Sequence, residues 1–380
     1  MQCPVAYQVA LLRSCARVER HDLRQLQFEN NFMKWDACAV HQAMKYIPIL
    51  DGLRAVAILI VLVSHVVTPW VPGGFGVTLF FFISGFIITR MMLAEPHNGV
   101  AMAQFYVRRM FRLYPALLLL LLTACGLALW MGSAIPRSDV LAVLLYFANY
   151  HEFHPLPAAN SPLVITWSLA VEEHFYMVYP ALMMLAGRRL LNVLLVVIVL
   201  TLAWRGYLVF ELNVDHYRTY LSTDTRIDSI AWGCLLAVLA GSKGGALERL
   251  RKMPLFYLGG ALVLATFVIR SEAFRETLRY SLQGLGLFMV LCELVVFQTG
   301  PNMVRQFLES PPMRWIGRIS YSLYLFHFLI LTTFDNLGWT SPWARVAVLT
   351  MSFVVAELSC RLVETPCRKF GHELALKIGR

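Results

Sequence analysis

The sequence predicts an all-helical bundle embedded in a membrane, and three observations support this prediction. Hydrophobic residues make up 58% of the 380 residues and charged residues only 15%, whereas soluble domains average roughly 45–50% and about 25%. Apolar stretches close to the ~20 residues that a helix needs to cross a bilayer recur along the chain. The 33 Lys and Arg residues lie mostly at the ends of these stretches, which is typical of a multi-pass membrane protein and not of one that binds nucleic acid.

Ten apolar stretches are candidates for spans. In chain order they are 47–68, 74–94, 113–132, 167–186, 190–210, 225–241, 254–270, 279–298, 317–335 and 343–363. An eleventh stretch, 139–150, is too short to cross comfortably and precedes a loop that contains prolines. If it does not cross, most of the basic residues fall on the cytoplasmic side, as the positive-inside rule requires. We therefore expect about ten spans, an outer half-helix at 139–150, and both termini in the cytoplasm.

The chain is expected to consist of one membrane domain with two short tails. Residues 1–43 are polar and mixed in charge, residues 44–370 form the membrane domain, and residues 371–380 form a cytoplasmic tail. Because Met44 leads directly into the first span, a native start at Met44 and a genuine tail at 1–43 are equal alternatives. The eight cysteines show neither a CxxC pair nor a metal-ligand spacing, so we expect no metal site. None of them falls in an outward-facing loop of this topology, so we expect no structural disulfide.

The first span carries two polar side chains that a lipid environment disfavours. Arg54 and His65 are 11 residues apart, so an unbroken helix places them on one face, roughly 16 Å apart along the axis. Arg54 lies near the inner surface and His65 in the outer half of the span. An ionisable group within a span indicates function by default, although an interhelical hydrogen bond is the ordinary role of a lone histidine.

A pair of arginines follows the second span. Arg109 and Arg112 are three residues apart and therefore share one helix face. Because arginine binds phosphate in a bidentate manner, the pair suits a phosphate-bearing ligand at the cytoplasmic mouth. Taken alone, the pair is more often explained by the positive-inside rule and by contact with lipid headgroups.

Two carboxylates lie within the fourth span. Glu172 shares one face with Tyr176 and Tyr179, and we expect it either to orient His65 or to pair with an arginine. Glu173 is the weaker candidate, because it faces the outer aqueous interface in the alternative interpretation.

Further polar side chains are expected in the interior of the bundle. Arg226 and Asp228 are more often a local ion pair than reagents, and Tyr324 and His327 either line a cavity or bond neighbouring helices. The full set of additional cavity candidates is Ser84, Glu173, Arg226, Asp228, Tyr324, His327 and Glu364.

A base in the outer half of the membrane and cations at the inner mouth together favour a transferase. Such an enzyme takes a phosphate-containing donor from the cytoplasm, and a histidine deprotonates an acceptor hydroxyl on the other side. Composition and spacing do not identify the transferred group. The alternative is a proton-coupled secondary transporter or flippase, which often shows inverted repeats; we find none in this sequence.

Several ordered motifs make the chain resemble acyltransferase family 3, the membrane O-acyltransferases of bacterial cell-surface glycans. They cover nearly all of residues 45–370. The matching stretches are Lys45–Arg54 with His65, Gly73–Val77 with Ser84–Phe86, Phe105–Pro115, Trp167–Tyr176, Arg226–Asp228, Ser320–His327 and Glu364–Pro366.

The resemblance implies a multi-pass enzyme of the inner (plasma) membrane and the lipid bilayer around it. It also implies an acyl-CoA donor, most often acetyl-CoA, and acyl transfer to a hydroxyl of an extracytoplasmic glycan or lipid-linked sugar. By motif, His65 is the essential histidine, Arg54 its partner on the span, and Arg109 and Arg112 the pair near the CoA phosphates. We expect direct transfer, with an acyl-histidine relay as the competing route.

Two features set this chain apart within the resemblance. Some family members carry an esterase-like soluble domain after the bundle, whereas this chain stops at Arg380. We therefore expect it to act alone or with a separate partner. Thr78 stands where many relatives have an acidic residue, which weakens any role for that loop.

Overall fold

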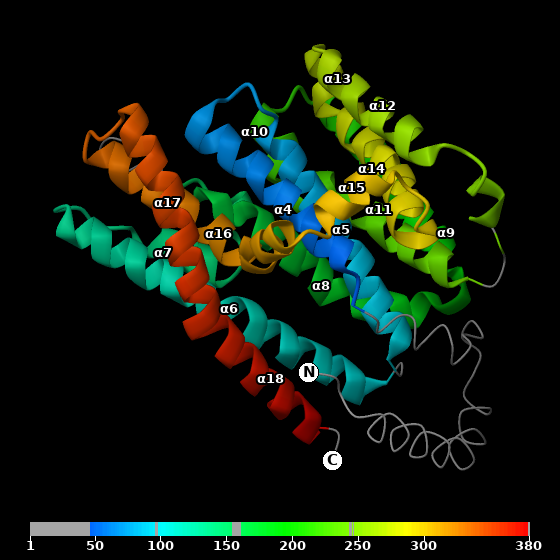
Figure 1. Cartoon of the computed structure of the whole chain (residues 1–380), viewed down its shortest axis with the longest axis horizontal. Coiled ribbons are helices and arrows are strands. Elements are labelled where there is room, and N and C mark those ends of the chain that lie inside the picture. Colours follow the sequence, from blue (N-terminus) through cyan, green and yellow to red (C-terminus); the bar gives the residue numbers. More distant parts are fainter. Residues whose placement is uncertain (1–45, 96–97, 154–160, 243–244, 246, 379–380) are drawn as a thin grey trace.

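The computed structural model describes residues 46–95, 98–153, 161–242, 245 and 247–378, and every regular element within them is helical (Figure 1). The tail predicted at 1–43 lies outside the described residues. The α-helices are α4 (Pro48–Leu62), α5 (Gly73–Ala94), α6 (Gly99–Trp130), α7 (Arg137–Leu144), α8 (Trp167–Ala186), α9 (Leu190–Phe210), α10 (His216–Leu221), α11 (Thr223–Gly241), α12 (Leu255–Val268), α13 (Glu272–Glu276), α14 (Leu278–Leu291), α15 (Asn302–Leu308), α16 (Pro311–Asn336), α17 (Pro342–Ser359) and α18 (Thr365–Ile378). Three π-helical turns, η1 (Val63–Val67), η6 (Cys292–Phe297) and η7 (Cys360–Glu364), extend α4, α14 and α17.

Six helical runs in the described residues are long and apolar enough to cross a membrane. They are Pro48–Val67, Gly73–Ala94, Gly99–Trp130, Val164–Phe210, Leu278–Phe297 and Pro342–Ile378. The run Val164–Phe210 contains two of the predicted spans, as α8 and α9, and the remaining predicted spans coincide with α11, α12 and α16. The all-helical prediction is therefore confirmed, whereas the number of crossings and the side of the termini stay predictions.

Two elements differ in extent from the predicted stretches. Helix α6 begins at Gly99 rather than at 113, because the side chain of Asn98 accepts a hydrogen bond from the backbone N–H of Ala101 at 2.8 Å and caps the helix. The basic segment is thus part of one rigid helix with the apolar span. The predicted half-helix is the short α7, and the chain turns at Tyr146, whose φ of 53° ends helical geometry.

The central helices approach one another closely at glycines. A Cβ at Gly233 of α11 would lie 2.0 Å from the carbonyl oxygen of Phe82 in α5, and a Cβ at Gly85 would lie 2.1 Å from that of Ile230. In the same way, a Cβ at Gly317 of α16 would lie 1.9 Å from the carbonyl oxygen of Asp51 in α4. Small residues at these crossings let helix backbones pack directly, as is common in membranes.

This packing predicts that Gly233→Ala lowers the thermal unfolding temperature of the detergent-purified protein. The added methyl group has no room beside Phe82, and overpacking of this kind typically costs about 1–3 kcal/mol. Gly126→Ala is the matched control, because nothing lies within 4 Å of the methyl group it adds to α6. Equal unfolding temperatures for the two variants would contradict the close α5–α11 contact.

Candidate functional site

The main cavity, of about 740 Å³, lies among α4, α5, α6, α8, α16 and the η7–α18 segment. It gathers side chains that are far apart in the sequence. Seven of the predicted site residues line it: Arg54, Ser84, Arg109, Arg112, Glu172, Tyr324 and Glu364.

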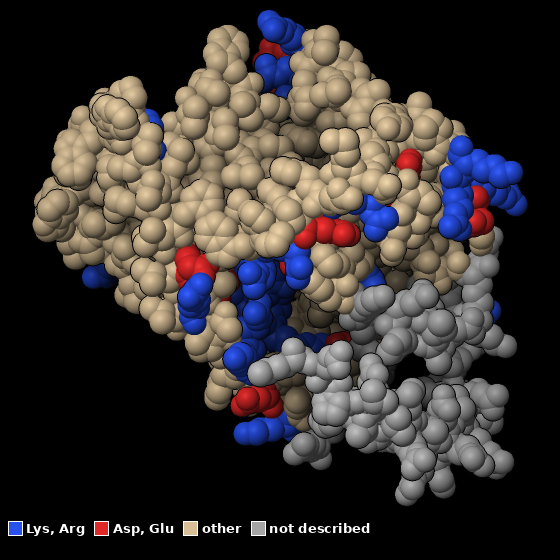
Figure 2. All heavy atoms as spheres, viewed as in Figure 1, with Lys and Arg blue, Asp and Glu red and all other residues tan. Residues whose placement is uncertain are grey.

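A second cavity, of about 470 Å³, adjoins the main one, and we call it the basic vestibule. It shares Arg54, Ser84, Arg109, Arg112 and Arg368 with the main cavity. Arg108, Lys369, His372 and Glu373 also line the vestibule. Figure 2 shows Lys and Arg side chains gathered beside a hollow on one face of the molecule.

Arg109 on α6 is held between the two carboxylates of α8. Its Nη2 lies 3.3 Å from Glu172 Oε2, and its Nε lies 3.0 Å from Glu173 Oε1. The guanidinium also lies over the ring of Tyr176, 3.8 Å from the centroid, and the Tyr176 hydroxyl donates to Glu172 at 3.2 Å. Glu172 therefore pairs with an arginine, which was one of its two expected roles.

The alternative that Glu173 faces outer water is wrong. Its side chain is only 13% exposed and accepts a hydrogen bond from Arg109. His174, the next residue, lies 2.7 Å from the hydroxyl of Thr223 on α11. The α8 carboxylates thus face the arginines of α6.

Arg54 and Arg112 line both cavities but differ in their partners. Arg54 lies 3.6 Å from Asp51, one turn earlier in α4, and Asp51 accepts a hydrogen bond from Tyr46. Arg112 forms no ion pair with any residue that the structure describes. In the described part of the chain, Arg109 of the predicted pair is therefore ion-paired and Arg112 is not.

His65 pairs with His327. Nδ1 of His65 lies 2.9 Å from Nε2 of His327, and the two rings stack at an interplanar angle of 6°. His65 belongs to the π-helical turn η1, a local feature often found at functional sites. His327 is fully buried in α16, whereas His65 is exposed.

The hydrogen bonds of His327 fix the tautomers of the pair. Nδ1 of His327 lies 2.6 Å from the carbonyl oxygen of Tyr324, which only accepts, so this nitrogen carries the proton. Nε2 of a neutral His327 is then an acceptor, and Nδ1 of His65 must donate to it. The lone pair of His65 consequently resides on Nε2, the nitrogen that is directed away from His327.

Tyr324 lines the main cavity and lies close to His327. Its hydroxyl lies 2.8 Å from the hydroxyl of Ser168 and donates to the carbonyl oxygen of Ile165 at 2.9 Å. The centroid of its ring lies 5.8 Å from that of His327. His65 and His327 are not among the lining residues of either cavity in the described part of the chain.

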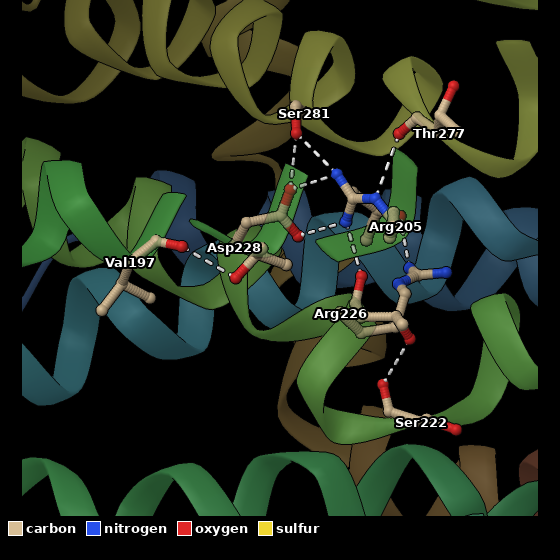
Figure 3. A network of polar contacts seen from close by, with 10 residues as sticks. Val197, Arg205, Ser222, Arg226, Asp228, Thr277 and Ser281 are labelled. Atoms are coloured by element: carbon tan, nitrogen blue, oxygen red, sulfur yellow. Dashed lines mark hydrogen bonds and ion pairs between the residues drawn. The ribbon is translucent and has the colours of Figure 1, made fainter. Parts of the chain in front are cut away.

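Arg226 and Asp228 belong to a buried network outside both cavities, which corrects their predicted place (Figure 3). Asp228 receives hydrogen bonds from Arg205 of α9 at 2.9 and 2.7 Å and from Ser281 at 2.7 Å. Arg226 instead donates to Thr78 at 2.9 Å and lies 4.0 Å from the ring centroid of Tyr280.

Arg205 was not among the sequence-predicted candidates. Hydropathy places Arg205 near the outer end of its span, where an arginine is usually interpreted as a residue of the membrane interface. The sequence did not indicate that Arg205 contacts Asp228, because the two residues lie on different helices. Its side chain is fully buried together with that of Asp228.

Glu364 closes the main cavity near the end of the helical run through α17. It lies in the turn η7, lines the cavity, and accepts a hydrogen bond from Ser322 of α16. The hydroxyl oxygens of Ser322 and Ser359 lie 2.7 Å apart, and Ser359 is the donor because the Ser322 proton is directed at Glu364. This cluster links α16 to the end of α17 and to the turn η7 that follows it.

The sequence model of one protein family, described as an acyltransferase domain, matches residues 47–360. The match includes α4 to α17 and therefore nearly every side chain of the site described above. The chain belongs to this acyltransferase family, so the predicted resemblance is confirmed.

Named relatives agree with the family. A peptidoglycan O-acetyltransferase, OatA, of Listeria monocytogenes is 30% identical over 86% of this chain and 56% of its own length. The O-acetyltransferase OatA of Staphylococcus aureus is 28% identical over 86% of this chain and 58% of its own length. A putative O-acetyltransferase of Staphylococcus aureus is 30% identical over 87% of this chain and 59% of its own length.

The chain thus spans between half and two thirds of the length of these curated relatives. No solved structure matches the chain.

Proposed function

We propose that this protein is a membrane O-acyltransferase that moves an acyl group, acetyl by likeness to its relatives, from acyl-CoA to a hydroxyl of a cell-surface glycan. One observation carries the proposal most directly. The cationic cavity is lined by Tyr324 and Ser168, and the ring of Tyr324 lies 5.8 Å from His327, the partner of a histidine with an available lone pair. A thioester donor and a hydroxyl acceptor need these two environments, one on each side.

In this proposal the donor enters from the cytoplasm through the basic vestibule. The protein spans the plasma membrane about ten times, with both termini on the cytoplasmic side. The cations of the vestibule bind the phosphates of CoA, and the main cavity takes the pantetheine arm as far as Tyr324. Glu172 and Glu173 fix Arg109 in the wall of this passage, a role different from the predicted orientation of His65.

The acceptor hydroxyl approaches His65 from the other side. Nε2 of His65 removes the hydroxyl proton as the acceptor oxygen bonds to the acyl carbon. The bond between that carbon and sulfur breaks, and CoA leaves as a thiolate that takes up a proton. The bond from Nδ1 of His65 to His327 strengthens as the ring becomes positively charged. Tyr324 must move for the acyl carbon to meet the acceptor.

An acyl-histidine relay is the competing route, because the same Nε2 lone pair is a nucleophile. We favour direct transfer. Incubation with labelled acetyl-CoA in the absence of acceptor distinguishes the two routes, because only the relay leaves label on the protein.

The proposal is tested by following radiolabelled acetyl-CoA in membrane vesicles that contain the protein and in vesicles that lack it. Label is expected in the glycan or lipid-linked sugar fraction only when the protein is present, with succinyl-CoA as a second donor in parallel. A folded protein that labels nothing from either donor would overturn the proposal and favour the transporter or flippase interpretation.

A further inference from the structure

The helix α18 places a second group of cations beside the vestibule. Arg368, Lys369 and His372 line the vestibule from this helix, and all three are exposed. The helix begins at Thr365, after the last residue of the family match. These cations are therefore a feature of this chain that the family assignment does not account for.

Helix α18 packs against α6, which fixes the position of its backbone beside the vestibule. Gly371 is buried against α6, where a Cβ would lie 2.3 Å from the Cβ of Phe111, and the rings of Phe370 and Phe111 lie 5.4 Å apart. Arg112 directly follows Phe111 on α6. In Figure 1 the two helices run side by side, so the cations of α18 face the same space as Arg112.

The charges of the vestibule are only partly balanced. Arg108 is paired with Glu95 at 2.6 Å, Arg109 with the α8 carboxylates, and Arg54 with Asp51. Within the described part of the chain, neither Arg368 nor Lys369 forms an ion pair, as is also the case for Arg112. Glu373 is the one described carboxylate that lines the vestibule. The unpaired cations leave a positive site for a multiply charged anion.

We propose that Arg112 together with Arg368 and Lys369 binds the 3′-phosphate of the acyl-CoA donor, while Arg109 serves to hold α8. The inference rests on the acyl-CoA donor of the proposed function. It goes beyond that function by naming the cations that bind the 3′-phosphate. A phosphate monoester carries close to two negative charges at neutral pH. Arginine and lysine side chains from two helices match this group, in which both charges lie on one phosphorus, whereas each phosphorus of the CoA diphosphate carries one charge.

The test measures binding rather than turnover. The full-length protein, purified in an uncharged detergent, is titrated with CoA and with 3′-dephospho-CoA by calorimetry. The wild type is expected to bind CoA at least about tenfold more tightly, the effect of one charge-assisted hydrogen bond. In the double variant Arg368→Ala/Lys369→Ala this preference is expected to disappear, while the affinity for 3′-dephospho-CoA stays unchanged.

Lys377→Ala is the matched control. Lys377 is an exposed cation on the same helix and is not a lining residue of the vestibule. This variant is expected to retain the preference for CoA. Glu373→Gln provides a test of opposite sign, because removing the carboxylate should tighten the binding of CoA.

The other source of phosphate at this surface is the lipid headgroup, and the same titration in bilayer discs with and without anionic lipid separates the two. The inference is overturned if the double variant keeps the preference for CoA. It is also overturned if the wild type shows no preference but the double variant loses binding to anionic lipid. If the wild type binds neither CoA nor 3′-dephospho-CoA, then acyl-CoA is not the donor, and the proposed function itself is contradicted.

Discussion

Replacing His65 by alanine is expected to lower the rate of acyl transfer by about 10²–10⁴-fold, the range typical for the loss of a general base. The structure gives a specific reason for this loss. In the tautomers of the two histidines, the available nitrogen lone pair resides on Nε2 of His65. The rate is measured as label passing from acetyl-CoA to glycan at saturating donor. Donor affinity should not change, since His65 does not line the cavities.

Variants of His327 are expected to lower the acyl-transfer rate to different extents, because His327 orients His65. In His327→Gln, the side-chain oxygen takes approximately the position of Nε2 and still accepts from His65. In His327→Asn, the amide instead takes the position of Nδ1, and this acceptor is lost. We therefore expect the glutamine variant to retain clearly more activity than the asparagine or alanine variants. Equal activity in the glutamine and asparagine variants would contradict an orienting role, since loss of packing alone does not distinguish them.

Arg205→Ala is expected to give the largest loss of stability, about 3–5 kcal/mol, the usual cost of removing one partner of a buried ion pair. The substitution leaves the fully buried carboxylate of Asp228 with Ser281 and without its arginine. The free energy of unfolding in mixed micelles is the measurement. An Arg205→Ala protein as stable as the wild type would show that Asp228 is satisfied without its partner.

The double variant Arg205→Met/Asp228→Leu is the control for this prediction. Replacing both members of a buried pair by apolar side chains is often neutral or stabilising, so most of the lost stability should return. The acyl-transfer rate of this variant should stay near that of the wild type, because the network lies outside both cavities. A severe loss of activity in a stable double variant would assign a functional role to the network.

The sequence was sufficient to predict the helices and most members of the site, because both depend on local patterns. Apolar stretches locate helices, and an ionisable residue within such a stretch stands out wherever it occurs. His65, His327 and Tyr324 were found in this way. The sequence did not indicate how these three residues lie together, with Tyr324 lining the cavity and close to His327.

What could not be predicted depends on how neighbouring helices are shifted along one another. For Glu172 the sequence left two roles open, to orient His65 or to pair with an arginine, and the structure places it 3.3 Å from Arg109. Their contact requires α6 to continue through its basic segment, which hydropathy does not indicate. Residues 371–380 were expected to form a cytoplasmic tail, whereas the helix α18 continues to Ile378. An amphipathic helix that packs on one side has the composition of a surface segment, so composition did not indicate it.

The Tyr324–Ser168 contact has a consequence for the energetics of the cell. A charge that crosses a membrane potential of 100 mV gains or loses about 2.3 kcal/mol, so an aqueous path through a polar bundle would dissipate the gradient. With the sidedness proposed above, an aqueous path from the main cavity toward the histidine pair would meet Tyr324, whose hydroxyl is already bonded to Ser168 and Ile165. An uncharged acyl group would pass such a contact at a lower cost than an ion. Under the proposed mechanism, Tyr324 would therefore also limit the leakage of ions.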